Sequence, residues 1–294
     1  MKENSLLIVG TGYVGFSVGK YFIEKGFCVY GLCRDRKKKE KFEKESIIPL
    51  FLDITKKSGL KNLPSVNYVL VSVAPDQREP EDYEELYVKG IGNVLDFLKN
   101  QPSLKKLIYV SSTGVWKDKK GEVVKEDDSP DADTPRGKIL IEAEKQILDS
   151  QLPSLILRLS GIYGPGRNRL HYIDRGTWPK GGSSRMMNMI HLTDITRAIA
   201  FLFNQGKIGE VYVGTDDEPV LNSQFCDWLS KEGISIPSIE WNVNSITGKQ
   251  CQNKKLISLG FEFQYPTFRE GYRSLLKSKS QETISKTQTN HKFQ

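Results

Sequence analysis

The residues best suited to chemistry lie near the start of the chain, where three glycines form a G-x-G-x-x-G pattern. In this pattern Gly10 would permit a tight turn, Gly12 would leave space for a pyrophosphate, and Gly15 would let the next helix pack close to the preceding strand. The helix N-terminus would offer free N–H groups and a partial positive charge to phosphates. The pattern therefore predicts a dinucleotide site, with a purely structural turn as the alternative. The candidate binding residues are Gly10, Thr11, Gly12, Tyr13, Val14 and Gly15.

The end of the second expected strand distinguishes between two dinucleotides. Cys33 stands about 20 residues past the loop, where an acidic residue would bind the ribose 2′-OH of NAD. Arg34 follows it, and Asp35 is surrounded by basic residues. A 2′-phosphate would be bound by Arg34, with Arg36 as a second candidate, so we expect NADP rather than NAD. Lys38 and Lys39 are interpreted as solvated charges at a helix start.

A parallel sheet must position this loop. Up to about residue 160, short apolar runs alternate with helix-period stretches, which is typical of strands joined by crossover helices. We therefore expect a Rossmann-type, doubly wound α/β fold. The expected strands are Leu6–Gly10, Cys28–Cys33, Ile47–Leu52, Tyr68–Val73, Leu107–Ser111 and Leu155–Leu159. The expected helices are Tyr13–Lys25, which would end at Gly26, a helix that follows Pro80, and Gly137–Leu148.

The pattern loosens after Gly166. We expect a dinucleotide-binding domain over 1–166, a small substrate lobe over 167–276 that is partly interleaved with it, and a disordered polar tail over 277–294. The lobe would hold a helix over Asp194–Phe203, a strand over Val211–Val213 and a helix over Ser223–Lys231. The substrate pocket would lie in the loosely patterned segment over 167–185.

Composition argues against several classes of protein. The formal net charge is +7, but part of that excess lies in the polar tail and no nucleic-acid-binding module accompanies it. A membrane-spanning helix needs roughly 18 consecutive apolar residues, and the sequence contains no such run. The N-terminus lacks the pattern of a secretory signal, so we expect a cytoplasmic protein. The four cysteines lack zinc-ligand spacing, so we expect free thiols and no metal site.

Several later segments resemble those of a known family. Residues 110–116 are similar to the fifth-strand signature of the extended short-chain dehydrogenase/reductase family, the group of nucleotide-sugar epimerases and dehydratases. Residues 158–166 resemble its sixth-strand signature, 190–194 its motif in the second lobe, and 253–271 its closing helix. The resemblance covers about 5–276. The chain is most similar to an atypical, YeeZ-like subgroup that has Pro-Arg-Gly in place of the usual tyrosine segment.

The resemblance implies roles for particular residues. Asp53 resembles the family residue that hydrogen-bonds the adenine amino group, with an ordinary strand-end aspartate as the alternative, and Ser72 is a further candidate for cofactor binding. In the family, a Ser/Thr, a Tyr and a Lys do the chemistry. The Tyr exchanges a proton with the substrate oxygen, and the Lys binds the nicotinamide ribose and lowers the pKa of the Tyr. Ser112 matches the Ser/Thr, but Arg136 stands at the Tyr position and Leu140 at the Lys position.

Arg136 cannot exchange a proton as the family Tyr does, and Leu140 cannot bind a ribose as the family Lys does. Arginine stays protonated because its pKa lies above about 12, and leucine has no polar group for a ribose. Lys138 would lie about 200° round the helix from residue 140, facing away. Arg136 itself has two interpretations that remain open. It would either bind an anionic substrate group or developing oxyanion, or form a salt bridge to Asp131 or Asp133.

Four tyrosines and one histidine are further candidates for proton transfer. Tyr163 and Tyr172 are favoured over Tyr83 and Tyr87, although packing is the more ordinary role for Tyr163. His191 lies in a motif that we interpret as structural. We expect an NADP(H)-dependent oxidoreductase or epimerase-like enzyme that uses Ser112 and Arg136 on a small polar, sugar-derived or anionic substrate. The alternative is a non-catalytic NADP(H)-binding sensor or regulatory module. Related folds often pair through helices, here near 81–99 and 137–149, which leaves a homodimer open.

Overall fold

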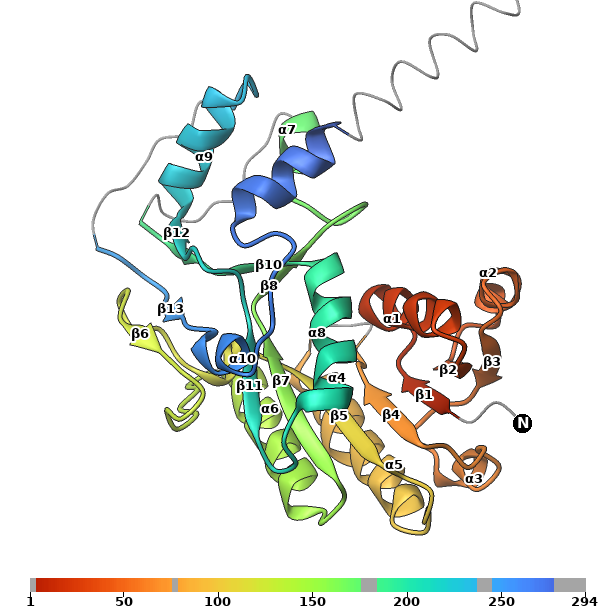
Figure 1. The fold of residues 1–294 in the computed structure, drawn as a ribbon. Coiled ribbons are helices and arrows are strands. Elements are labelled where there is room, and N and C mark those ends of the chain that lie inside the picture. The colour runs from red at the N-terminus through yellow and green to blue at the C-terminus, as the bar shows by residue number, and fades with distance from the viewer. Residues whose placement is uncertain (1–3, 76–78, 176–183, 237–244, 278–294) are drawn as a thin grey trace, which may run out of the picture.

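The computed structural model describes residues 4–75, 79–175, 184–236 and 245–277. Within these ranges, seven strands form one parallel sheet in the order β3-β2-β1-β4-β5-β7-β11 (Figure 1). They are β1 (Ser5–Val9), β2 (Cys28–Cys33), β3 (Ile48–Phe51), β4 (Tyr68–Val71), β5 (Lys106–Ser112), β7 (Ser154–Leu159) and β11 (Val211–Gly214). The strands expected from the sequence are confirmed to within two residues at their ends.

Helices cover both faces of this central sheet, which confirms the doubly wound α/β fold. One face packs against α1 (Tyr13–Glu24), α2 (Lys39–Lys44) and α8 (Leu192–Gln205). The other packs against α3 (Lys57–Leu60), α4 (Pro80–Glu84), the π-helix η2 (Glu85–Gly90), α5 (Ile91–Leu98) and α6 (Pro135–Asp149). Because both faces are covered, the strands are continuous apolar runs, and Leu6 to Val9 are each 0% exposed.

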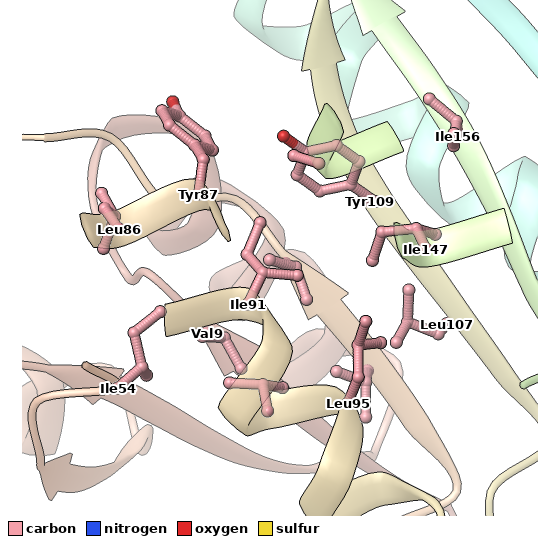
Figure 2. Packing of buried hydrophobic residues seen from close by; sticks show 14 of the residues in the cluster. Val9, Ile54, Leu86, Tyr87, Ile91, Leu95, Leu107, Tyr109, Ile147 and Ile156 are labelled. Carbon is pink, nitrogen blue, oxygen red and sulfur yellow. The ribbon is translucent and has the colours of Figure 1, made fainter. Parts of the chain in front are cut away.

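Figure 2 shows part of the second core, where Val9 and Leu107 of the sheet face Ile91 and Leu95 of α5. The sequence pattern predicts a single continuous helix after Pro80, with one apolar stripe. The structure instead divides it into α4, η2 and α5. A π-turn adds one residue to the helical repeat and shifts the stripe, and such turns are frequent at functional sites.

Helix ends follow the local sequence. Gly26 has φ +82°, the left-handed conformation that glycine adopts most readily, and it follows α1 closely, as predicted. Proline stands at the first position of both α4 and α6, where no N–H is needed. The Thr134 side chain accepts a hydrogen bond from the Gly137 N–H at 3.2 Å and so caps α6.

A second, smaller core lies beyond the carboxyl ends of the strands. It is rich in aromatic side chains, including Phe225, Trp228, Phe268 and Tyr272, and it lies at the upper left of Figure 1. Its elements include α7 (Leu170–Asp174), α9 (Asn222–Lys231) and a helix over 268–277. Short strand pairs accompany them: β8 (Gly161–Tyr163) with β10 (Met189–His191), and β9 (Met186–Met187) with β12 (Val220–Leu221). We call this region the second lobe.

Two elements expected in the second lobe lie elsewhere: the helix predicted over 194–203 is α8, which packs on one face of the central sheet, and the predicted strand lies at the edge of that sheet. The strand predicted over 211–213 is β11, which pairs in parallel with β7 and forms an edge of the central sheet. It joins that sheet because α8 carries the chain back across it, and Ile195, Ile199 and Leu202 of α8 are buried against its face. Another short pair, β6 (Val123–Val124) with β13 (Gln250–Cys251), and α10 (Lys254–Ser258) complete the fold.

Lys277, the first residue of the predicted polar tail over 277–294, ends the helix over 268–277 and is not disordered. Residues 278–294, and residues 176–183 of the segment predicted to hold the substrate pocket, lie outside the described residues, so the predictions for them stay predictions. Among the helices of the described ranges, none combines the length and the apolar character needed to cross a lipid bilayer.

Candidate functional site

A cleft of about 630 Å³ lies at the carboxyl ends of the strands, and its size is typical of a small-molecule site. It straddles β1 and β4, where the strand order reverses and where open α/β sheets place their ligands. Most of the residues that the sequence singled out line it. These are Gly10, Thr11, Gly12, Tyr13, Val14, Arg34, Asp53, Ser72 and Ser112.

The three glycines of the loop are needed for three different reasons. Gly10 has φ +92°, and a Cβ there would lie 2.8 Å from the Ser72 backbone. A Cβ at Gly15 would lie 2.5 Å from the Gly10 carbonyl oxygen, so Gly15 serves close packing and does not line the cleft. At Gly12 a Cβ would meet no atom within 4 Å, because this position opens into the cleft. Space for a ligand is therefore found where the glycine pattern predicts it.

Two hydroxyl groups hold the loop in place. Thr11 is 2% exposed, and its Oγ1 donates toward the carbonyl oxygens of Ile8 and Leu32, each at 3.2 Å. The Ser72 hydroxyl donates to the Gly10 carbonyl oxygen at 3.0 Å. Since both hydroxyl protons are directed at the protein, Thr11 and Ser72 shape the loop, and any ligand would meet backbone N–H groups of the first turn of α1.

Basic side chains gather at one end of the cleft. Arg34 lines it as expected, and Lys38 does too, although the sequence suggested a solvated charge. Lys38 reaches the cleft for a local reason: Asp35 accepts a hydrogen bond from the Lys37 N–H at 2.9 Å, and the resulting 3₁₀ turn η1 (Arg36–Lys38) brings Lys38 back to the cleft. Arg36, the second candidate for a 2′-phosphate, instead stacks on Phe51, 5.4 Å from its ring centre, and does not line the cleft.

Asp53 also lines this end. Partial burial favours its neutral form, but hydrogen bonds from the Thr55 N–H and hydroxyl, at 3.0 and 2.9 Å, and the nearby Arg34 outweigh burial. The pKa of Asp53 is therefore lowered, and the group is a carboxylate at neutral pH. It can accept a hydrogen bond from an amino group, as its resemblance to the adenine-binding residue implies.

The other end of the cleft carries serine hydroxyls. Ser112 is half-buried there, and its Oγ accepts a hydrogen bond from the Gly114 N–H at 3.0 Å, at the start of the 3₁₀ turn η3 (Thr113–Val115). Ser111 and Ser160 also line the cleft, and their Oγ atoms are buried without a hydrogen-bond partner among the described residues. Buried polar atoms are rarely left unpaired, so this end fits a polar ligand.

Sequence reasoning missed Ser111 and Ser160, but a signal for them exists. Ser111 lies near the end of β5, and Ser160 directly follows β7. Both therefore stand at carboxyl ends of parallel strands, which face the ligand in such folds.

Arg136 does not line the cleft. It is exposed, and its guanidinium lies 5.7 Å from the centre of the Tyr83 ring. The salt bridge to Asp131 is not formed, because that carboxylate pairs with Lys117 and Lys119. Leu140 does line the cleft, so an apolar side chain stands at the position of the family lysine. Lys138 is exposed and does not line it, as the helical angle indicates.

The tyrosines at the cleft are not the two that the sequence favours. Tyr83 and Tyr87 line it, whereas Tyr163 and Tyr172 do not, so that preference was wrong. Tyr163 instead stacks on Tyr272, with ring centres 4.8 Å apart, because the pairing of β8 with β10 turns it into the core of the second lobe. Packing is thus its observed role.

Tyr87 is held firmly beside the cleft. Its hydroxyl donates to the Val73 carbonyl oxygen at 3.1 Å, and Figure 2 shows that hydroxyl directed away from the packed aliphatic side chains. Burial raises the pKa of Tyr87, so it stays protonated at neutral pH. Tyr83 is half-buried, with its ring centre 5.4 Å from that of Tyr87.

His191 has a structural place. Its Nδ1 accepts a hydrogen bond from the Thr193 N–H at 3.2 Å and caps α8, and it does not line the cleft. Burial lowers the pKa of His191 to about 4, so the ring is neutral at physiological pH.

Comparisons with known proteins agree with this geometry. A model of the NAD dependent epimerase/dehydratase family matches residues 6–213. The chain is 26% identical to the protein YeeZ of Escherichia coli strain K12 over 267 residues, 88% of this chain and 95% of YeeZ. It is 28% identical to a candidate NAD-dependent epimerase/dehydratase from Methylobacillus flagellatus, with a TM-score of 0.77 over 94% of this chain and 99% of that one.

More distant structures share the fold. UDP-glucose 4-epimerase from Thermotoga maritima, solved with UDP-glucose, is 19% identical, with a TM-score of 0.77 over 93% of this chain and 99% of that one. The family match spans the glycine loop and every strand of the central sheet except the first residue of β1 and the last of β11. The resemblance inferred from the motifs is therefore confirmed, and the chain belongs to the NAD dependent epimerase/dehydratase family.

Proposed function

We propose that the protein is an NADP(H)-dependent oxidoreductase or epimerase-like enzyme that acts in the cytoplasm on a small polar, sugar-derived or anionic substrate. One observation carries the proposal: a single cleft joins the open face of Gly12, the basic side chains Arg34 and Lys38 at one end, and the hydroxyl groups of Ser112 and Tyr83 at the other. When bound, the nicotinamide would supply or accept a hydride at the hydroxyl end.

The preference for NADP over NAD rests on charge. A 2′-phosphate is a dianion that favours cations, and Arg34 and Lys38 both line the cleft after β2. Cys33, where NAD-binding proteins have an acid, offers no carboxylate to a free 2′-hydroxyl. Asp35 lines the same region, but its carboxylate is engaged by the Lys37 N–H.

The chain's own residues would orient the substrate and move a proton. The Ser112 hydroxyl is placed to donate a hydrogen bond to a substrate oxygen. Tyr83 of α4 lines the cleft and would supply a phenol hydroxyl, and the Arg136 guanidinium over its ring adds positive charge close by. Arg136 would therefore act through Tyr83, whereas the sequence left open both direct contact with an anionic substrate group and a salt bridge to Asp131 or Asp133.

The test is a calorimetric titration of the purified protein with NADPH and with NADH. We expect tighter binding of NADPH, by at least about tenfold, since hydrogen bonds to charged groups contribute roughly 1.5–3 kcal/mol. Arg34→Met should remove that preference and leave NADH binding unchanged. Arg36→Met is the matched control, because Arg36 stacks on Phe51 outside the cleft and should have no effect. Equal affinities in the wild type would refute the NADP assignment.

The alternative is a non-catalytic NADP(H)-binding sensor or regulatory module. It is favoured by Arg136 and Leu140, which replace the two residues that the family uses for proton transfer and ribose binding. The two functions differ in one observable, the redox state of the bound nicotinamide. The purified protein is mixed with NADPH and a panel of carbonyl and sugar compounds. A loss of NADPH absorbance with any of them supports an enzymatic function. Tight NADPH binding without turnover across such a panel supports the sensor.

A further inference from the structure

A basic side chain faces the glycine loop from across the cleft. Arg167 lines the cleft, and its guanidinium lies 5.6 Å from the centre of the Tyr13 ring. Tyr13 directly follows Gly12, the glycine that opens into the cleft. The cation therefore stands beside the first turn of α1, where free N–H groups and the helix dipole already favour an anion.

The position of Arg167 is set by backbone contacts. Arg167 and Gly164 close a tight turn with hydrogen bonds in both directions, at 2.8 and 3.1 Å. The Tyr13 hydroxyl donates to the Pro165 carbonyl oxygen at 2.9 Å, and a Cβ at Gly164 would lie 2.8 Å from that hydroxyl. The turn that carries Arg167, which we call the 164–167 turn, is thus joined directly to the glycine loop.

Arg167 keeps its hydrogen-bond donors available. In the part of the chain that the structure describes, no carboxylate forms an ion pair with it. The guanidinium lies over the Tyr13 ring, a contact that uses none of its five N–H donors in a conventional hydrogen bond. An exposed arginine at a cleft, with donors in plane and no competing acid, is suited to a phosphate group.

We propose that Arg167 binds the pyrophosphate of the dinucleotide, opposite the N-terminus of α1. The inference rests on the proposed function and extends it by adding a phosphate ligand that comes from outside the glycine loop. Arg34 and Arg167 then bind different phosphate groups of the same cofactor. Arg34 recognises the 2′-phosphate and gives specificity, whereas Arg167 recognises the pyrophosphate that NADP and NAD share and contributes equally to both.

The test uses calorimetry with four probes on two variants. NADP⁺ carries both phosphate groups of interest, NAD⁺ and ADP-ribose carry the pyrophosphate alone, and 2′-AMP carries the 2′-phosphate alone. Arg167→Met should weaken NADP⁺, NAD⁺ and ADP-ribose by a similar factor of at least about ten and leave 2′-AMP unchanged. Arg34→Met should weaken NADP⁺ and 2′-AMP and leave NAD⁺ and ADP-ribose unchanged.

Two control variants show whether weaker binding comes from loss of the phosphate contact or from misfolding of the variant. Arg175→Met removes an exposed arginine beyond α7 that does not line the cleft, and it should bind every probe as the wild type does. Arg167→Lys keeps the charge without the planar fork and should recover part of the affinity for ADP-ribose. Unchanged ADP-ribose binding in Arg167→Met would overturn the inference and leave the proposed function intact. A wild type that binds none of the four probes would overturn both.

Discussion

At the scale of single residues, two glycines of the glycine loop have different roles. Gly12 is free of neighbours and faces the cleft, while Gly15 is pressed against the loop backbone. Gly12 also has φ −89°, outside the left-handed region that favours glycine, so neither its φ nor a neighbouring atom requires glycine there. The ligand requires it, and the two effects can be separated by substitution.

Gly12→Val should abolish NADPH binding, because its side chain would fill the space that the pyrophosphate needs. Its free energy of unfolding should stay within about 0.5 kcal/mol of the wild type, as for a surface substitution. Gly15→Val should instead destabilise the protein by about 1–3 kcal/mol or more, since its Cβ would lie 2.5 Å from a carbonyl oxygen. Calorimetry and urea unfolding measure the two effects. Normal NADPH binding by Gly12→Val would remove the loop from the ligand site.

His191 makes stability depend on pH. Its pKa is about 4 in the folded protein against an ordinary value of 6.5, so between these values the unfolded chain binds a proton that the folded chain does not. Stability from this group is therefore complete above pH 6.5 and is lost as the pH falls toward 4. The loss between pH 7 and pH 5 should be about 2 kcal/mol.

Urea unfolding at both pH values, compared with His191→Asn, isolates this contribution. Asparagine keeps a cap acceptor for the Thr193 N–H but does not titrate. The drop in stability on acidification should therefore be about 2 kcal/mol smaller in the variant, while carboxylates titrate alike in both proteins. An equal drop in both proteins would exclude His191 as its cause.

At the scale of elements, α6 is tied to β7 by a buried ion pair. Glu144 accepts three hydrogen bonds from Arg158, at 2.9, 3.3 and 2.7 Å. Both side chains are 4% exposed, and the guanidinium lies 4.6 Å from the Trp116 ring centre. Such a pair costs free energy to desolvate, so replacing both partners is far milder than removing one.

Glu144→Gln should lower the free energy of unfolding by about 3–5 kcal/mol, because it leaves the arginine buried without a counter-charge. The double variant with Glu144→Leu and Arg158→Met should recover much of that loss. The check is a set of urea unfolding curves for the wild type, the single variant and the double variant. A double variant less stable than Glu144→Gln would show that the pair itself is strongly net stabilising.

The sequence predicted the helices and strands better than it predicted the positions of single side chains. Strands such as β2 are apolar on both faces, and the expected Cys28–Cys33 agrees with the structure at both ends. The π-turn η2 was missed because Tyr87 and Ile91, which are both buried, are four residues apart and so also fit one face of an uninterrupted α-helix. Lys38 was misplaced because its position depends on the hydrogen bond from the Lys37 N–H to Asp35, a local detail that charge patterns do not encode.

At the scale of the whole molecule, the site depends on contacts between distant segments. The resemblance predicted the cleft and the second lobe, but it could not show which tyrosines reach the cleft. Tyr163 points into the second lobe because β8 pairs with β10, whose residues follow about 28 positions later. The contact of Arg136 with Tyr83 likewise joins two helices whose relative angle no local pattern specifies.

The edge position of β11 has a consequence for synthesis of the protein. When residues 1–166 have left the ribosome, β7 is still the sheet edge, with one side of its backbone unpaired, and α8 has not yet covered its face. At 5–20 residues per second, β11 follows only after a few seconds. During that interval the nascent chain exposes an apolar strand edge of the kind that drives aggregation. The dinucleotide-binding half therefore cannot finish folding before the second lobe has begun to emerge.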